Sequence, residues 1–139
     1  MSFEKWEQEI VDSYPEVFSE FRDRGYGFEC GEGWNGIISE FCRRISELDK
    51  PVKIVWMKEK FGTLDINTEP CYTKSVKLDD MSFREGSYTY MTWAELEDII
   101  EWVTNASEET CESCGEPGEL RKVNWMKVRC DSCYEPKTN

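Results

Sequence analysis

The sequence predicts an α+β fold, with about three helices and a small antiparallel sheet, followed by a C-terminal zinc ribbon. Three observations predict it. Apolar residues recur at helical spacing in three segments, and two short β-branched segments flank a turn that contains glycine. Two Cys-x2-Cys pairs near the C-terminus are separated by 15 residues. With 139 residues, we expect an acidic α+β domain over 1–107 and the ribbon over 108–139.

The first helix is expected over Phe3–Ser13, with Phe3, Trp6 and Ile10 on one face. Pro15 then either begins a second short helix over Pro15–Arg24 or kinks the first one. Residues 25–33 are glycine-rich and read as a loop, with some strand character where aromatic and cysteine side chains alternate.

The next helix has the clearest pattern in the chain. Its apolar positions follow one face almost without interruption, and Asp49 to Pro51 end it. These positions are Trp34, Ile37, Ile38, Phe41, Cys42, Ile45 and Leu48.

Two strands are expected next, over Val52–Met57 and Thr63–Thr68, joined by a hairpin turn near Glu59–Gly62. A third strand is expected over Ser87–Met91, because Tyr88 and Tyr90 alternate with polar residues.

The last helix is expected to begin at a capping box, Thr92 to Glu95, and to bury a stripe formed by Leu96, Ile99, Ile100 and Val103. Residues 104–110 then connect this helix to the ribbon.

The metal site is predicted from Cys111, Cys114, Cys130 and Cys133. Two Cys-x2-Cys knuckles at this separation direct four thiolates at one ion, and Gly115 suits the left-handed turn after the first knuckle. We expect one structural Zn²⁺ per chain, because four thiolates leave no open position for a substrate. The alternative is two disulfides. The odd total of seven cysteines and the charged N-terminus, which does not resemble a signal peptide, favour a reducing cytoplasm instead.

The net charge of −12 is unevenly distributed. Residues 1–110 carry 24 acidic and 12 basic side chains, whereas residues 111–139 carry five of each. An acidic body disfavours nonspecific binding to nucleic acid and suits a partner with a basic surface; alternatively, the charge only maintains solubility. No apolar run is long enough to span a membrane.

An enzyme is not expected, because the chain has no histidine and no motif of acid–base, nucleophilic or phosphate-binding catalysis. Gly31, Gly33 and Gly36 match a dinucleotide-binding pattern. A tight turn at a helix N-terminus explains them better, because the flanking Glu29 and Glu32 would face the pyrophosphate.

Two groups of basic residues are candidate binding sites. Lys58 and Lys60, on either side of Glu59, either bind a small anion or nucleotide or belong to a solvated hairpin turn. Arg121, Lys122, Lys127 and Arg129 surround Trp125 in the ribbon. They either contact nucleic acid or balance the negative charge of a thiolate–metal centre. Of the remaining cysteines, Cys42 is expected in the core, and no role is predicted for Cys30 or Cys71.

Three segments carry a resemblance to a family of small proteins encoded by bacteriophages and prophages. They are Gly27 to Trp34 (GFECGEGW), Val55 to Leu64 (VWMKEKFGTL) and the two cysteine pairs, in that order. The last metal position of this family is often histidine, where this chain has Cys133. The resemblance implies a phage protein acting in the bacterial cytoplasm, but it implies no particular activity.

The combined expectation is a non-enzymatic phage accessory protein that binds and modulates a host protein with a basic surface, such as a defence or nucleic-acid enzyme. The alternatives are a nucleotide-binding protein that uses Lys58 and Lys60, and a nucleic-acid-binding zinc ribbon.

Overall fold

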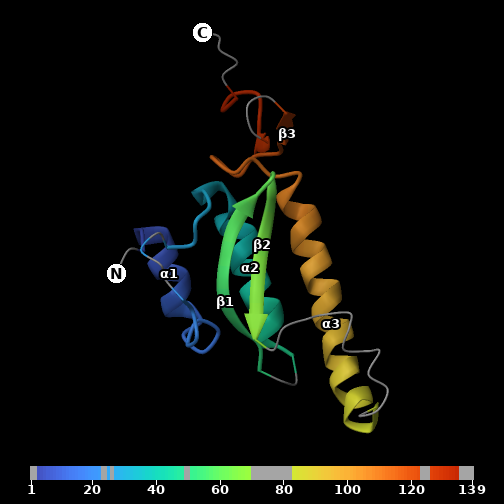
Figure 1. Cartoon of the computed structure of the whole chain (residues 1–139). Coiled ribbons are helices and arrows are strands. Elements are labelled where there is room, and N and C mark those ends of the chain that lie inside the picture. The colour runs from blue at the N-terminus through green and yellow to red at the C-terminus, as the bar shows by residue number, and fades with distance from the viewer. Residues whose placement is uncertain are drawn as a thin grey trace.

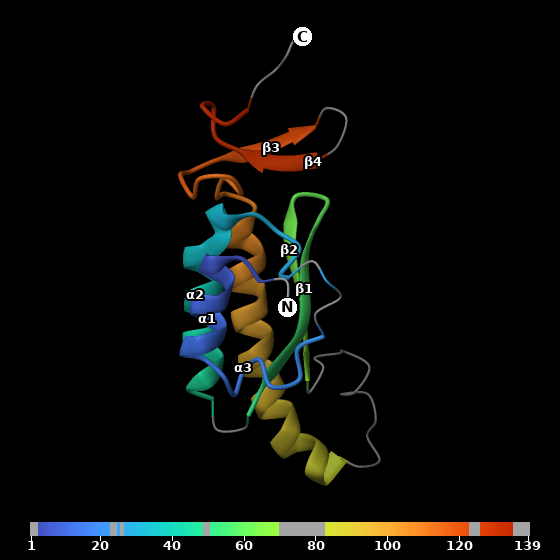
Figure 2. The same cartoon turned by 90° about the vertical axis from the view of Figure 1, so that its left-hand side faces the viewer.

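Three helices lie on one side of a two-stranded antiparallel sheet, and a second two-stranded sheet lies beyond one end of them (Figures 1 and 2). The structure is a computed structural model that describes residues 3–22, 25, 27–48, 51–69, 83–122 and 126–134, with only the backbone described for 83–93. The predicted α+β class is confirmed.

Helix α1 (Lys5–Ser13) forms as expected and buries Trp6 and Ile10. Its first turn is closed by the Glu4 backbone N–H, which donates to Glu7 Oε1 at 2.9 Å.

The predicted helix over Pro15–Arg24 does not form in the residues described, and residues 15–20 make turns instead. The reason lies in β1 (Lys53–Lys60). The Arg22 N–H donates to Val55 O at 2.7 Å, and the Ile54 N–H donates to Val17 O at 2.8 Å. Because the edge of β1 forms hydrogen bonds with these backbone groups, residues 17–22 run alongside the strand and do not form a helix.

The strongest helical pattern produces α2 (Asn35–Ser46), preceded by a short 3₁₀ turn, η1 (Glu32–Trp34). Trp34 is fully buried at this junction. The predicted core stripe is confirmed, since α2 buries Ile38, Phe41, Cys42 and Ile45.

The predicted hairpin is also confirmed. β1 pairs with β2 (Thr63–Glu69), and Phe61 and Gly62 form the turn between Lys60 and Thr63. Ile54, Met57 and Leu64 are buried on the face toward the helices. Successive cross-strand pairs alternate between the two faces of the sheet. Met57–Ile66 and Glu59–Leu64 lie on the face toward the helices, so Lys58–Asp65 and Lys60–Thr63 project from the outer face.

Helix α3 (Phe83–Ser107) corrects two predictions. The strand over Ser87–Met91 is wrong, because this segment is helical, and Thr92 does not begin a helix because it lies inside one. Once packing fixes the C-terminal half of a helix, the helix can lengthen toward its N-terminus. Each added hydrogen bond then requires only one more residue to become ordered. Two alternating tyrosines are too short a pattern to compete with that extension. The expected stripe holds where it is described, with Leu96 and Val103 buried.

Phe28 is the centre of an aromatic cluster that the sequence assigned to a loop. Its ring is fully buried and stacks on Phe18 with centroids 5.5 Å apart. It also meets Phe3, Trp6 and Phe21 at 5.5–5.7 Å in edge-on geometry. This cluster closes the core between α1 and residues 17–22, which run along the edge of β1.

The ribbon contains the expected hairpin, in which β3 (Glu119–Lys122) pairs with β4 (Met126–Arg129). It lies next to the β1–β2 turn, at the end of the body where α3 finishes (Figure 2). Val123 and Trp125 lie outside the described residues, as do Asp49 and Lys50, two of the residues predicted to end the second helix.

Candidate metal centre

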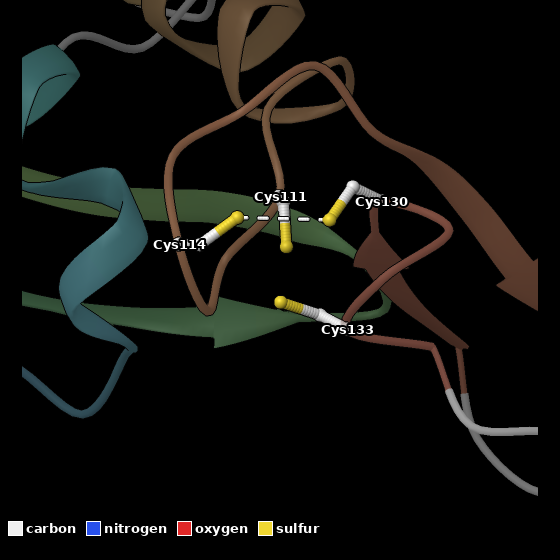
Figure 3. Close-up of side chains that lie close together, drawn as sticks. All are labelled: Cys111, Cys114, Cys130 and Cys133. Carbon is white, nitrogen blue, oxygen red and sulfur yellow. Dashed lines mark hydrogen bonds between the residues drawn. The ribbon is translucent and has the colours of Figure 1, made fainter.

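Four cysteine thiols converge between the end of α3 and the far end of β4 (Figure 3). Cys111 and Cys114 come from the turn that follows α3, and Cys130 and Cys133 come from the turn that follows β4. Their Sγ atoms all lie within 4.8 Å of one another. All four cysteines are free thiols, so the fold gathers them without a disulfide.

The two knuckles are built alike. In the first, the Gly115 N–H donates to Cys111 O at 2.9 Å, and in the second, the Tyr134 N–H donates to Cys130 O at the same distance. Gly115 adopts a φ of 87°, the left-handed conformation that the sequence predicted for it. Each turn therefore brings its two thiols onto one side of the backbone.

The hairpin between the knuckles holds them in register. The Glu112 N–H donates to Val128 O at 3.0 Å, which ties the first knuckle to β4. Val128 is fully buried, whereas Leu120 on the facing strand is half-buried. Since the ribbon buries so little apolar surface in its described residues, hydrophobic packing alone stabilises it weakly.

The geometry fits a tetrahedral ion. Sulfur atoms that each lie 2.3 Å from a central metal are separated by about 3.8 Å along the edges of the tetrahedron. The Cys114 and Cys130 Sγ atoms are 3.6 Å apart. Thiolates select soft or borderline metals, so the donor set suits a transition metal ion rather than calcium or magnesium.

The thiols also influence one another's ionisation. Burial acts to raise the pKa of Cys111, but hydrogen bonds from the backbone around Cys130, Cys114 and Ser113 outweigh it and lower that pKa to about 6. The neighbouring thiols of Cys114, Cys130 and Cys111 raise the pKa of Cys133 to about 12. One thiol of the cluster therefore ionises readily. Ionisation of the other thiols becomes favourable only when a bound cation offsets the added negative charge.

The first knuckle docks onto the start of α2, a contact that the sequence did not predict. The Gly33 N–H donates to Glu112 O at 2.7 Å, and the Gly31 N–H donates to Glu112 Oε2 at 2.8 Å. The buried Trp34 ring donates from Nε1 to Thr110 O at 2.9 Å. Gly31 and Gly33 thus allow close packing of two backbones, in agreement with the turn interpretation, whereas Gly36 lies in open space.

Three of the four basic ribbon residues pair with acids of this chain. Arg121 meets Asp131 at 2.8 Å, Lys127 meets Glu59 at 2.9 Å, and Arg129 meets Glu112 at 3.4 Å. The two latter acids are largely buried, with 15% and 7% of their side chains exposed. Besides balancing charge, the Lys127–Glu59 pair joins the ribbon to β1, and the Arg129–Glu112 pair joins β4 to the first knuckle. Lys122, in contrast, is exposed and makes no ion pair among the described residues.

Lys58 and Lys60 project from the outer face of β1 and do not belong to the thiol cluster. The Lys58 ammonium lies 5.2 Å from the centre of the Trp56 ring. Arg22, Trp56 and Lys58 line one hollow on this face. The sequence gave no reason to group Arg22 with the two lysines.

The other cysteines have ordinary structural positions where they are described. Cys42 is fully buried on α2, as predicted, and burial raises its pKa to about 12. Burial, followed by the charges of Glu112 and Glu7, raises the pKa of Cys30 well above its usual range. Both thiols therefore stay protonated at neutral pH and are poor nucleophiles. Cys71 lies outside the described residues.

None of the helices that the structure describes combines the length and the apolar character that a membrane crossing requires. Comparison of the chain with models of protein families, with curated proteins and with solved structures finds no match.

Proposed function

We propose that the four cysteines bind one Zn²⁺ ion and that this ion is structural. The convergence of four thiols within 4.8 Å supports this proposal. Zinc commonly takes four thiolates in closed tetrahedral sites, which have no position for a substrate. In this role the metal supplies much of the folding free energy of the ribbon.

Metal analysis of protein purified without added zinc tests this proposal, and we expect one zinc per chain. Cys130→Ser should lose the metal and unfold the ribbon, with the helices of residues 1–107 largely retained in circular dichroism. Cys30→Ala, which changes a cysteine outside the cluster, should keep the metal. Protein that contains no zinc and four oxidised cysteines would show that the zinc assignment is wrong.

We further propose that the protein is a non-enzymatic phage accessory protein that binds and modulates a host protein through a basic surface of that partner. The exposed acidic side of α3 carries this proposal. Glu95, Asp98, Glu101 and Glu108 are all exposed, and residues 94–110 contain no lysine or arginine.

Two of the acids are placed unfavourably for the helix. Glu108 and Glu109 follow the C-terminal end of α3, where the helix dipole disfavours acids, and the last turn has no basic residue. Arg44 of α2 lies beside Glu95 and Asp98, but residues 94–110 themselves supply only acids. A surface in which acids outnumber bases in this way suits electrostatic recognition of a basic partner. The resemblance to phage and prophage proteins supports a bacterial host cytoplasm as the setting.

A matched pair of variants tests this interface. Glu95→Gln/Asp98→Asn/Glu101→Gln neutralises the α3 surface, and Glu9→Gln/Asp12→Asn/Glu20→Gln removes the same charge from the α1 side. We expect the wild type and the α1 variant to retain one basic protein from a bacterial lysate at physiological salt. The α3 variant should release it.

Equal retention by both variants would contradict a role for α3, and retention of nothing by the wild type would contradict the proposed function. Purified partner should then bind with an affinity that falls as salt increases, because exposed charges are screened. Nucleic-acid binding by the ribbon is not proposed, because Arg121, Lys127 and Arg129 are engaged in ion pairs within the chain.

A further inference from the structure

Unpaired cations gather on the outer face of the β1–β2 hairpin, although the chain is strongly acidic. Among the lysine and arginine side chains that the structure describes, Arg43, Arg44, Lys53, Arg121, Lys127 and Arg129 all make ion pairs. Arg22, Lys58 and Lys60 make none in that same part of the chain. In a molecule with 29 acids and 17 bases, cations left unpaired together are available for an external anion.

These cations line two adjoining hollows that share Lys58. One has a volume of about 350 Å³ and is lined by Arg22, Glu29, Trp56 and Lys58. The other, of about 460 Å³, reaches the hairpin turn and the ribbon. Its lining consists of Lys58, Glu59, Lys60, Phe61, Met126 and Lys127.

Each hollow also has an aromatic wall. The Trp56 ring is half-buried, and the Lys58 ammonium lies over it. Phe61 is 70% exposed and is the large hydrophobic side chain that the described surface leaves most open. Cations next to exposed aromatic rings are the combination that binds phosphate together with a stacked base.

The backbone around the hollows is held in unfavourable conformations. Glu29 and Phe61 have φ values of 60° and 55°, and the other described residues with positive φ are glycines. Such residues cost free energy and occur preferentially at functional sites. Each of them lines one of the two hollows.

The carboxylates nearby do not neutralise the lysines. Glu59 accepts from the Gly62 N–H at 2.7 Å and pairs with Lys127, so its charge is directed away from Lys58 and Lys60. Asp65 is opposite Lys58 in the sheet register, but no ion pair joins these two side chains. Asp65 and Glu29 still reduce the positive potential, which sets a moderate affinity.

We propose that this face of the hairpin binds a nucleoside phosphate. The base stacks on Trp56, from which Lys58 moves toward the phosphate, and Lys60 and Arg22 complete the anion site. A hollow of about 350 Å³ is within the size range of small-ligand pockets. The net charge of −12 opposes a longer polyanion, so the proposed ligand is a free mononucleotide rather than a nucleic-acid strand.

Calorimetric titration of the zinc-replete protein at low salt tests the proposal, with AMP, GMP, CMP and UMP as ligands. We expect at least one of them to bind, and inorganic phosphate and the unphosphorylated nucleoside to bind about 10-fold more weakly or not at all. Lys58→Ala/Lys60→Ala and Trp56→Leu should each weaken binding by about 10-fold or more.

The matched control is Lys5→Ala/Lys122→Ala, which removes two exposed lysines that make no ion pair with any described residue. It should change the affinity by less than about twofold. Circular dichroism and zinc content verify that each variant is folded. The proposal is overturned if none of the four nucleotides binds at millimolar concentration, or if the control loses as much affinity as Lys58→Ala/Lys60→Ala. Equal affinity for phosphate overturns the stacking role of Trp56, and tighter binding of a twelve-nucleotide thymidine strand overturns the mononucleotide assignment.

Discussion

At the scale of single residues, Gly33 shows most directly how the cysteine knuckle and the body depend on each other. A Cβ at this position would overlap the carbonyl oxygen of Cys111 and would lie 2.5 Å from that of Glu112. Both obstacles are backbone atoms, which cannot rotate away as a flexible side chain can. Gly36, three residues later in α2, would have no atom within 4 Å of its Cβ.

These two glycines provide a stability prediction with its own control. Gly33→Ala should lower the free energy of unfolding by about 1–3 kcal/mol, because the knuckle must move off the body. Gly36→Ala should raise that free energy by about 0.5–1 kcal/mol, because alanine favours the helical conformation. Urea unfolding followed by circular dichroism measures both. A Gly33→Ala protein as stable as the wild type would show that the observed docking does not exist in solution.

Glu112 is the other residue whose importance depends on its neighbours. It lies between Cys111 and Cys114, and its carboxylate accepts from the Gly31 N–H of the body and pairs with Arg129 of β4. A carboxylate only 7% exposed is costly to bury unless its oxygens are paired in this way. One side chain therefore connects the knuckle, the hairpin and the loop before α2.

At the scale of elements, the first knuckle, η1 and the start of α2 form one connected unit. Trp34 caps the core beneath α2, and its indole N–H reaches Thr110 at the start of the knuckle. Metal binding should therefore affect the body as well as the ribbon. The contact is local, so α1 at the far side of the core should respond much less.

Removal of the metal tests this coupling. On chelation, the indole N–H resonance of Trp34 in a ¹H–¹⁵N spectrum should shift or broaden, because its acceptor Thr110 is released. The resonance of Trp6, whose indole donates to Glu4 at 3.1 Å, should change little and serves as the control. An unchanged Trp34 resonance after complete metal loss would mean that the ribbon and body are uncoupled.

At the scale of the whole molecule, charge is sorted by surface. Arg121, Lys127 and Arg129 of the ribbon pair with acids of this chain, and residues 94–107 of α3 contain acids but no lysine or arginine. Among the described residues, Arg22, Lys58 and Lys60 near the outer face of the hairpin make no ion pair. The net charge of −12 conceals this arrangement. Two surfaces of opposite sign would place the proposed basic partner and the proposed small anion at separate sites.

Several features follow from the sequence alone because they are local. The spacing of Cys111, Cys114, Cys130 and Cys133 predicts the cluster, since each knuckle closes within a few residues. The stripe of α2 and the glycine turn of the β1–β2 hairpin are equally local, and both are confirmed.

Other features were decided only by tertiary contacts. Residues 87–91 are helical because α3 is one long helix, although their own pattern suggests a strand. Phe28 belongs to the core because four aromatic rings from other segments surround it. Arg22, Trp56 and Lys58 line one hollow because residues 17–22 follow the edge of β1. Periodicity describes a segment and its nearest neighbours, whereas these arrangements depend on backbone groups and rings that are distant in sequence, so only the folded chain brings them together.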